Sequence, residues 1–349
     1  MYTNSRNKKY GRAMLLMIIA SLLLAVTPVF GAGTYQTKDR KVANSTQPAY
    51  NFRISGDRFV FIEKDKAGIP QVYLRSVKTG KLEQITNSNT FKTSIRIKGD
   101  DIFFLESTIP VTKNINVYRK NIIQYNLKTK ETQQLLDEGD YPEYLNVDGN
   151  YLVYSTSHDG YTIINLKTKQ TKVLDKSYKV MDIADGKLLV RQDYPDYTLS
   201  TYDIATDKVT SVVTMKDNQE FHNAAFNGKY VIWFTETKNQ PDPTKKIQYL
   251  NAYTIVDLTK PNAKQKTINL SSSIHNAPNQ LLSVGTNYVA WTEKVNDKHI
   301  ARGMDLRTGD IFNYGDMNKN QSNFLYFVGD ELLMQEDDGN ISLRSVVRR

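Results

Sequence analysis

The chain has 349 residues, of which 24% are charged; it carries a formal net charge of +9 and contains no cysteine. A chain of this length can bury a core large enough to fold without cross-links, so a disulfide-stapled scaffold is excluded. The basic excess is mild and is not gathered into one stripe, which argues against a nucleic-acid-binding protein.

Residues 1–33 have the pattern of a secretory signal peptide. Four basic residues and no acid precede the apolar run Ala13–Val26, and the small residues Gly31-Ala32-Gly33 follow it. The run has 14 residues, fewer than the ~20 that a membrane-spanning helix needs. We therefore predict cleavage after Gly31 or Gly33, a secreted or extracytoplasmic location and no transmembrane span after cleavage, with an uncleaved anchor as the alternative. An exported chain without cysteine is more typical of bacteria than of eukaryotic secretion.

The rest of the chain repeats a short turn followed by an apolar run. The turns centre on glycines 37 to 57 residues apart, namely Gly56, Gly99, Gly149, Gly186, Gly228, Gly285 and Gly329. The runs are rich in Val, Ile, Tyr, Phe and Trp, as in Phe59–Ile62, which favours buried strands. In six copies a second signature follows, an apolar residue, then Asp, Asn or Ser, then a Thr-containing turn. Each copy reads as four short strands, and self-similarity at this period is typical of a β-propeller or a solenoid.

The two ends of the repeat series predict that the strands close into a ring. The last copy stops at Ile341–Arg349, which supplies a third strand but no fourth. The segment before the first copy, Asp39–Asp57, parallels Gly80–Asp100, where a fourth strand leads into the next copy. We therefore predict an all-β, seven-bladed β-propeller of four-stranded antiparallel blades, in a single domain over residues 34–349. Its N-terminal strand, near Arg40–Asn44, completes the last blade. An open β-solenoid or a pair of β-sandwiches is the alternative.

Units with a glycine turn, an apolar strand and an apolar-Asp-Leu-x-Thr-Gly turn resemble the repeats of TolB-like (PD40, WD40-like) β-propellers of bacterial envelopes. The resemblance covers essentially the whole chain after residue 33, and Met304–Asp310 is one such turn. The Trp-Ser-Pro-Asp-Gly stretch usual in that family is reduced here to Asp148-Gly149, Asp185-Gly186 and looser variants. The resemblance therefore implies the fold and not the partners of that family.

A His-Asn-Ala tripeptide occurs twice, at His222-Asn223-Ala224 and His275-Asn276-Ala277, just before the first strands of units five and six. In a propeller the loops from strand four to strand one and from strand two to strand three lie on one face, which we call the top face. We expect both tripeptides in top-face loops. As candidate ligand-binding residues we take His222, Asn223, His275 and Asn276. A metal site needs three or more convergent ligands, and no metal or cofactor is predicted. The alternative is that His-Asn shapes the same loop twice by hydrogen bonding.

Six units carry an acid at the end of strand two, seven or eight residues after the repeat glycine. These acids are Glu63, Glu106, Asp193, Glu236, Glu293 and Glu336, and unit three has Thr156 in the same place. One interpretation is an acidic rim on the top face that binds a cation, a sugar or a basic partner. The other is that polar residues cap solvated strand ends.

Two loops between strands two and three are long, Ser107–Asn121 and Thr237–Gln248. They carry Tyr118 and Lys245, which complete the set of candidate ligand-binding residues, because long loops on a rigid scaffold are where binding specificity usually resides. The alternative is that both are insertions without a role.

The sequence contains no G-x-S-x-G elbow, P-loop, H-E-x-x-H motif or Asp-rich calcium loop, so no catalytic residue is predicted. We expect an exported, non-enzymatic, monomeric propeller that binds an envelope protein or a cell-wall or extracellular polysaccharide through its top-face loops. One alternative is a propeller enzyme, a polysaccharide lyase or glycosidase, that uses His222, His275 and rim carboxylates with a divalent metal. Another is a structural component of the cell surface or matrix.

Overall fold

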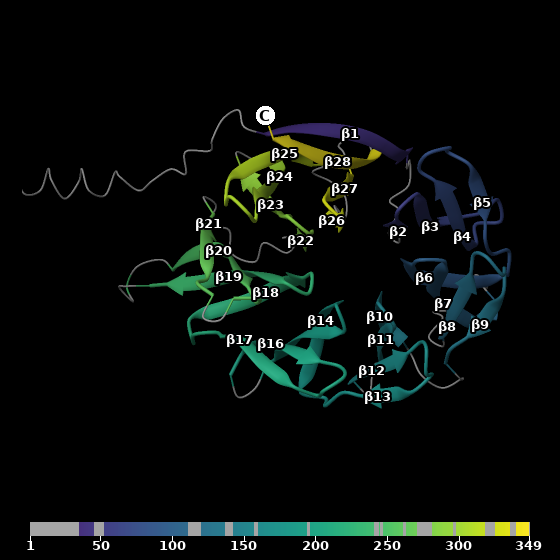
Figure 1. Ribbon diagram of the computed structural model, residues 1–349, viewed down its shortest axis with the longest axis horizontal. Coiled ribbons are helices and arrows are strands. Elements are labelled where there is room, and N and C mark those ends of the chain that lie inside the picture. Colours follow the sequence, from purple (N-terminus) through teal and green to yellow (C-terminus); the bar gives the residue numbers. More distant parts are fainter. Residues whose placement is uncertain are drawn as a thin grey trace, which may run out of the picture.

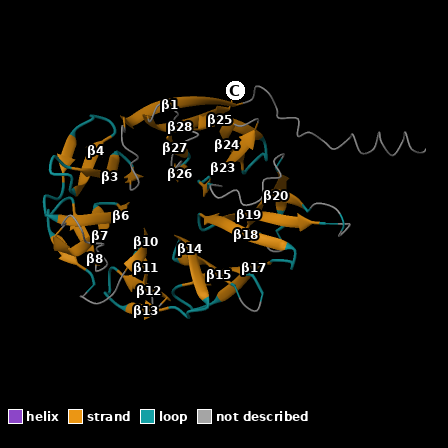
Figure 2. Ribbon diagram, turned by 180° about the vertical axis from the view of Figure 1, so that it is seen from behind, coloured by secondary structure: helices purple, strands orange, loops and turns teal. Residues whose placement is uncertain are grey.

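The computed structural model describes residues 35–44, 52–110, 120–136, 142–156, 160–193, 196–240, 244, 247–260, 263–270, 281–295, 298–317, 325–335 and 340–348. Within these residues the chain forms seven four-stranded antiparallel sheets around a central axis and no helix (Figures 1 and 2). The predicted all-β, seven-bladed propeller is confirmed. Residues 1–33 lie outside the described part, so the signal peptide stays a prediction.

Each blade takes four strands in sequence order from the axis outward, except that the last blade takes its outer strand from the start of the chain (Figure 1). Blades one and two consist of β2 (Phe52–Ser55), β3 (Arg58–Lys64), β4 (Pro70–Ser76), β5 (Leu82–Gln84), and β6 (Thr90–Lys98), β7 (Asp101–Pro110), β8 (Lys120–Asn126), β9 (Thr132–Gln134). Blades three and four consist of β10 (Pro142–Asp148), β11 (Tyr151–Thr156), β12 (Gly160–Asn165), β13 (Thr171–Val173), and β14 (Tyr178–Ala184), β15 (Lys187–Gln192), β16 (Thr198–Asp203), β17 (Val209–Thr214). Blades five and six consist of β18 (Gln219–Phe226), β19 (Tyr230–Asn239), β20 (Gln248–Asp257), β21 (Lys266–Asn269), and β22 (Leu282–Val284), β23 (Tyr288–Val295), β24 (Lys298–Asp305), β25 (Ile311–Met317). Blade seven consists of β26 (Leu325–Val328), β27 (Glu331–Gln335), β28 (Asn340–Arg348) and β1 (Tyr35–Asn44).

The hydrophobic core lies between the blades. Each of seven clusters of buried apolar side chains joins two neighbouring sheets. Between blades seven and one, for example, Leu333 and Leu343 pack against Phe52 and Phe59. The second strand of each blade is covered on both faces, which is why the run after each repeat glycine is apolar throughout instead of alternating.

The Asp, Asn or Ser of the second sequence signature shapes the turn between strands three and four. Asn126 Oδ1 accepts hydrogen bonds from the backbone N–H groups of Lys128 and Thr129, at 2.9 and 3.0 Å. The same type of bond, from an N–H two or three residues ahead, is accepted by Ser76, Asn165, Asp203, Asp257 and Asp305. A short polar side chain is required there because it replaces a backbone acceptor in the turn.

The repeat glycines are required for two different reasons. Gly56 has a φ of +59°, the left-handed region that residues with a Cβ rarely adopt. Gly285 is not in that region, but a Cβ there would lie 2.6 Å from the carbonyl oxygen of Gly329 and 2.8 Å from the ring of Phe327. Gly285 therefore permits the close packing of blade six on blade seven.

The N-terminal strand closes the ring as predicted. β1 pairs with β28 from Tyr35 opposite Arg348 to Asn44 opposite Asn340, so it begins five residues before the predicted Arg40. In Figure 1 it lies along the outside of the last blade, next to the C-terminus. The open solenoid and the pair of sandwiches are thereby excluded. No helix with the length and apolar character of a membrane span occurs in the described part of the chain.

Candidate functional site

The expectation that His222-Asn223-Ala224 forms a loop is wrong, because β18 runs through it. Phe221 pairs with Thr235 and Asn223 with Phe234, so His222 is the extra residue of a β-bulge. A bulge breaks the period-two alternation by which a strand is recognised, and it turns a side chain to a new direction. This explains why the sequence pattern pointed to a loop.

The two polar residues of the tripeptide have different surroundings. Asn223 Oδ1 accepts a hydrogen bond from the backbone N–H of Ala224 at 2.9 Å, which stabilises the strand just after the bulge. The His222 ring packs on the fully buried ring of Phe234, with centroids 5.4 Å apart. Its Nε2 atom is buried and has no hydrogen-bond partner. Packing thus holds an imidazole whose outer nitrogen is unsatisfied.

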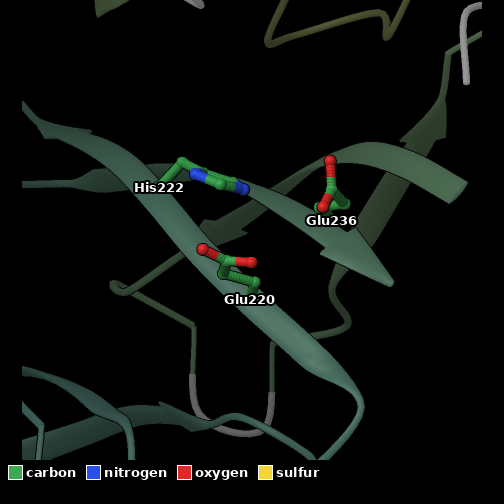
Figure 3. A group of neighbouring side chains, drawn as sticks. All are labelled: Glu220, His222 and Glu236. Carbon is green, nitrogen blue, oxygen red and sulfur yellow. The ribbon is translucent and has the colours of Figure 1, made fainter. Parts of the chain in front are cut away.

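Glu220, His222 and Glu236 come together at the top-face end of blade five. Glu220 and Glu236 lie directly opposite each other on β18 and β19. One donor atom from each of the three residues lies within 4.8 Å of the others. Figure 3 shows the His222 ring extending toward Glu236, with the Glu220 carboxylate beside them. Glu220 is exposed, His222 partly buried and Glu236 only 2% exposed, so the cluster opens to solvent on one side.

Within the described residues, this is the one place where three side chains of the His, Cys, Asp and Glu types converge closely enough to hold a metal. Sequence reasoning selected His222 and Glu236 but missed Glu220, which lies outside the repeat signatures. The pairing of β18 with β19 is what brings Glu220 to the other two.

The remaining predicted rim acids differ in their exposure and partners. Glu63 is exposed at the end of β3. Glu106 accepts a hydrogen bond from Ser88 Oγ at 2.6 Å and lies 3.8 Å from the ammonium group of the buried Lys92. Burial lowers the pKa of Lys92, and the Glu106 charge partly offsets that effect.

Two further acids are paired with cations of their own blade. Glu293, 8% exposed, receives the Arg302 guanidinium at 3.2 Å. Asp193 is bound by Arg191 at 2.6 Å and also by Lys179. The acids of blades two, four and six are therefore balanced by local Lys or Arg residues, and the rim is less acidic than the sequence pattern suggests.

Five predicted site residues lie outside the described part of the chain: Tyr118, Lys245, His275, Asn276 and Glu336. The strands beside the second long loop are described. β19 and β20 have ten residues each and stay paired out to Asn239 opposite Gln248, three pairs beyond Glu236. This hairpin extends past the ring in Figure 1, and its Leu250 is 53% exposed.

A second polar cluster, in the inner strands, was not predicted. Five inner strands carry a polar residue two positions before the strand ends, and we call this set the channel ring: Arg53, Arg96, Asn146, Asp182 and Tyr326. Arg96 donates to Asn146 at 3.1 Å, Asn146 donates to Asp182 at 3.4 Å, and the Arg53 guanidinium lies over the Tyr326 ring at 5.4 Å. The signal in the sequence was a polar residue three or four positions before the repeat glycine.

Two residues of the channel ring, Arg96 and Asp182, have shifted pKa values. Burial, together with the neighbouring Arg53 charge, lowers the pKa of Arg96 to about 9. Burial also raises the pKa of Asp182 to about 6, although its carboxylate accepts backbone N–H bonds from Phe226 and Ile183 at 3.0 and 2.9 Å. The bond to Phe226 crosses from blade four to blade five, so Asp182 has a role in joining blades.

No protein-family model and no curated protein sequence matches the chain. The solved structures that share its fold include two with TM-scores above 0.5. One is an oligogalacturonate lyase from Vibrio parahaemolyticus, with a TM-score of 0.55 and 12% identity over 90% of this chain and 97% of that one. The other is the Cps50 (Swd1) β-propeller domain of Myceliophteria thermophila, with a TM-score of 0.54 and 10% identity over 88% and 98%. At these identities they show the fold alone, and they confirm the fold-level resemblance to WD40-like propellers.

Proposed function

We propose that the chain is an exported, non-enzymatic β-propeller that binds a protein or polysaccharide of the cell envelope through the top face at blade five. The pattern of residues 1–33 supports export. The propeller supplies a rigid ring of similar units, in which function is carried by departures from the repeat.

The observation that carries the proposal is the long hairpin of β19 and β20. It extends three residue pairs beyond Glu236 and presents Leu250, which is 53% exposed. The Glu220, His222 and Glu236 cluster lies at its base. The register places Leu250 on one face of this hairpin and the acidic and imidazole groups on the other. An exposed apolar side chain and a polar cluster on one projecting element suit a ligand with both apolar and polar surface, as a protein or a sugar polymer has.

The experiment replaces Lys238–Tyr249 by Asn-Gly, a two-residue turn that closes the hairpin at the pair Thr237 and Leu250. We expect the variant to melt with the parent but to lose binding to insoluble peptidoglycan, to arrayed cell-surface glycans, or to an envelope protein captured by cross-linking. In a finer comparison, Leu250→Ser should weaken the same binding.

The matched control is Val173→Ser, which changes another exposed apolar strand residue, in blade three. Loss of binding in this control but not in the hairpin variants would refute the assignment to blade five. Binding that withstands all three changes would refute it as well.

One observation favours a second candidate, a propeller enzyme acting on a polysaccharide. Glu220, His222 and Glu236 combine two carboxylates with an imidazole, the groups used for proton transfer. One of the fold neighbours is an oligogalacturonate lyase. The purified chain should then release unsaturated or reducing ends from a polysaccharide panel, and His222→Phe should abolish the release. A binding protein releases none.

A further inference from the structure

We propose that Glu220, His222 and Glu236 bind a divalent transition-metal ion of the zinc and manganese class. The proposal goes beyond the binding function above and does not depend on it. It is carried by the register of two strands, by the burial of one carboxylate and by one unsatisfied nitrogen.

Two acids of the same charge face each other across β18 and β19. Glu220 and Glu236 are directly opposite on paired strands, and like charges in that position destabilise a sheet. Glu236 is only 2% exposed, so its carboxylate is largely removed from water. A cation between the two carboxylates reverses the sign of the interaction.

The His222 imidazole has a nitrogen that forms no hydrogen bond. Its Nε2 is buried without a hydrogen-bond partner, and buried polar atoms are nearly always satisfied by protein, water or an ion. The ring is held against Phe234, and the donor atoms of the three residues lie within 4.8 Å of one another. A metal ion would satisfy the nitrogen and would be bound by both carboxylates.

The donor set decides the class of metal. Calcium and magnesium take oxygen ligands, whereas imidazole suits zinc and other transition metals. Zinc bonds of about 2.0–2.2 Å require donors roughly 3.4 Å apart, so the cluster must contract slightly on binding. The exposed Glu220 can supply that movement by changing rotamer. Three protein ligands leave a coordination position open for water or for an oxygen of a bound ligand.

The test uses the purified chain after treatment with a chelator. We expect one equivalent of zinc by elemental analysis and calorimetry, and a rise of several degrees in melting temperature with Zn²⁺. Mn²⁺ should bind more weakly than Zn²⁺, and Ca²⁺ and Mg²⁺ should give little response. Both Glu220→Gln, at an exposed position, and His222→Phe, which keeps a ring against Phe234, should lower the zinc affinity at least tenfold.

The matched control is His299→Phe, which changes a partly buried histidine in blade six and should leave zinc binding unchanged. Absence of bound metal in the parent chain would overturn the proposal, as would full affinity in both cluster variants or a preference for Ca²⁺. These readouts need no partner or substrate, so failure of the binding function would leave this result standing, and the reverse also holds.

Discussion

Arg344 and Asp39 are 305 positions apart in the chain and form a two-bonded ion pair, with Nε and Nη2 of Arg344 at 2.6 and 2.8 Å from the Asp39 carboxylate. The third guanidinium nitrogen, Nη1, donates to the backbone carbonyl of Tyr314 in blade six. One side chain of β28 therefore connects the first strand, the last strand and the neighbouring blade. This contact lies at the seam where the ring closes.

Asp39→Asn should destabilise the protein more than Arg344→Met. The Arg344 side chain is 11% exposed and that of Asp39 is 46% exposed, so removing the acid takes the Asp39 carboxylate away from a mostly buried guanidinium. We expect losses of about 2–3 kcal/mol for Asp39→Asn and about 1–2 kcal/mol for Arg344→Met in the free energy of unfolding. Urea unfolding measures both. The exposed pair Arg40 and Glu331 supplies the control, since Arg40→Ala should cost under about 0.5 kcal/mol. Equal losses for all three variants would show that the pair of Arg344 and Asp39 contributes no more to stability than the exposed pair does.

Gly285→Ala should be more damaging than Gly329→Ala. A Cβ at position 285 would meet the carbonyl oxygen of Gly329 at 2.6 Å, whereas a Cβ at position 329 has open space and only a φ of +62° to tolerate. We expect about 2–4 kcal/mol of lost stability for the first and about 1 kcal/mol for the second. The urea unfolding midpoints of the two variants measure these losses. A larger loss for Gly329→Ala than for Gly285→Ala would mean that blade six packs differently on blade seven.

Stability should rise as the pH falls from about 6 to about 4, through Asp182. Burial raises the pKa of its carboxyl to about 6 in the folded protein, against about 3.9 in an unfolded chain. Between these values the folded state binds more protons, so protonation favours folding and ionisation at higher pH opposes it. Because Asp182 is partly exposed, we expect a difference of roughly 2 kcal/mol between pH 4 and 7.

The measurement is urea unfolding across that range for the parent chain and for Asp182→Asn, which cannot titrate. Other ionisable groups are common to both proteins and cancel in the difference. A difference that stays flat with pH would show that Asp182 titrates normally.

Two acids that occupy the same place in the repeat should differ in how much stability is lost when their charge is removed. Glu293→Gln leaves the buried Arg302 without its carboxylate partner and should cost about 2–4 kcal/mol in the free energy of unfolding. Glu63→Gln changes an exposed strand end and should stay within about 0.5 kcal/mol. Thermal and urea unfolding of the pair measure this. If both changes prove silent, the Arg302 bond contributes nothing net to stability.

Much of the fold could be predicted because the residues that define each turn and strand lie within a single repeat. The left-handed turn at Gly56 and the side-chain acceptor at Asn126 are single-residue requirements that recur at fixed places. The seam followed from an incomplete last copy and an unmatched first strand. The start of β1 at Tyr35 did not, because β-pairing with β28, and not local pattern, determines how far the strand extends.

The candidate site was only partly predictable. His222 and Glu236 stood out as repeated features, but Glu220 had no signature of its own. The bulge at His222 also concealed a strand within an expected loop. The channel ring was not predicted, since nothing local in the sequence shows that Arg96 and Asn146 meet between neighbouring blades.

The sequence alone determined the all-β class, the number of blades and the strand that closes the ring. Each repeat contains its own turn residues and its own apolar run, and these two features are enough to define a blade. The tertiary structure decided which charges meet. Glu293 and Glu236 hold equivalent places in the repeat, yet one faces Arg302 and the other faces Glu220 and His222. That difference arises across strands, where the partner of a side chain is set by register and bulges and not by its own neighbours in the chain.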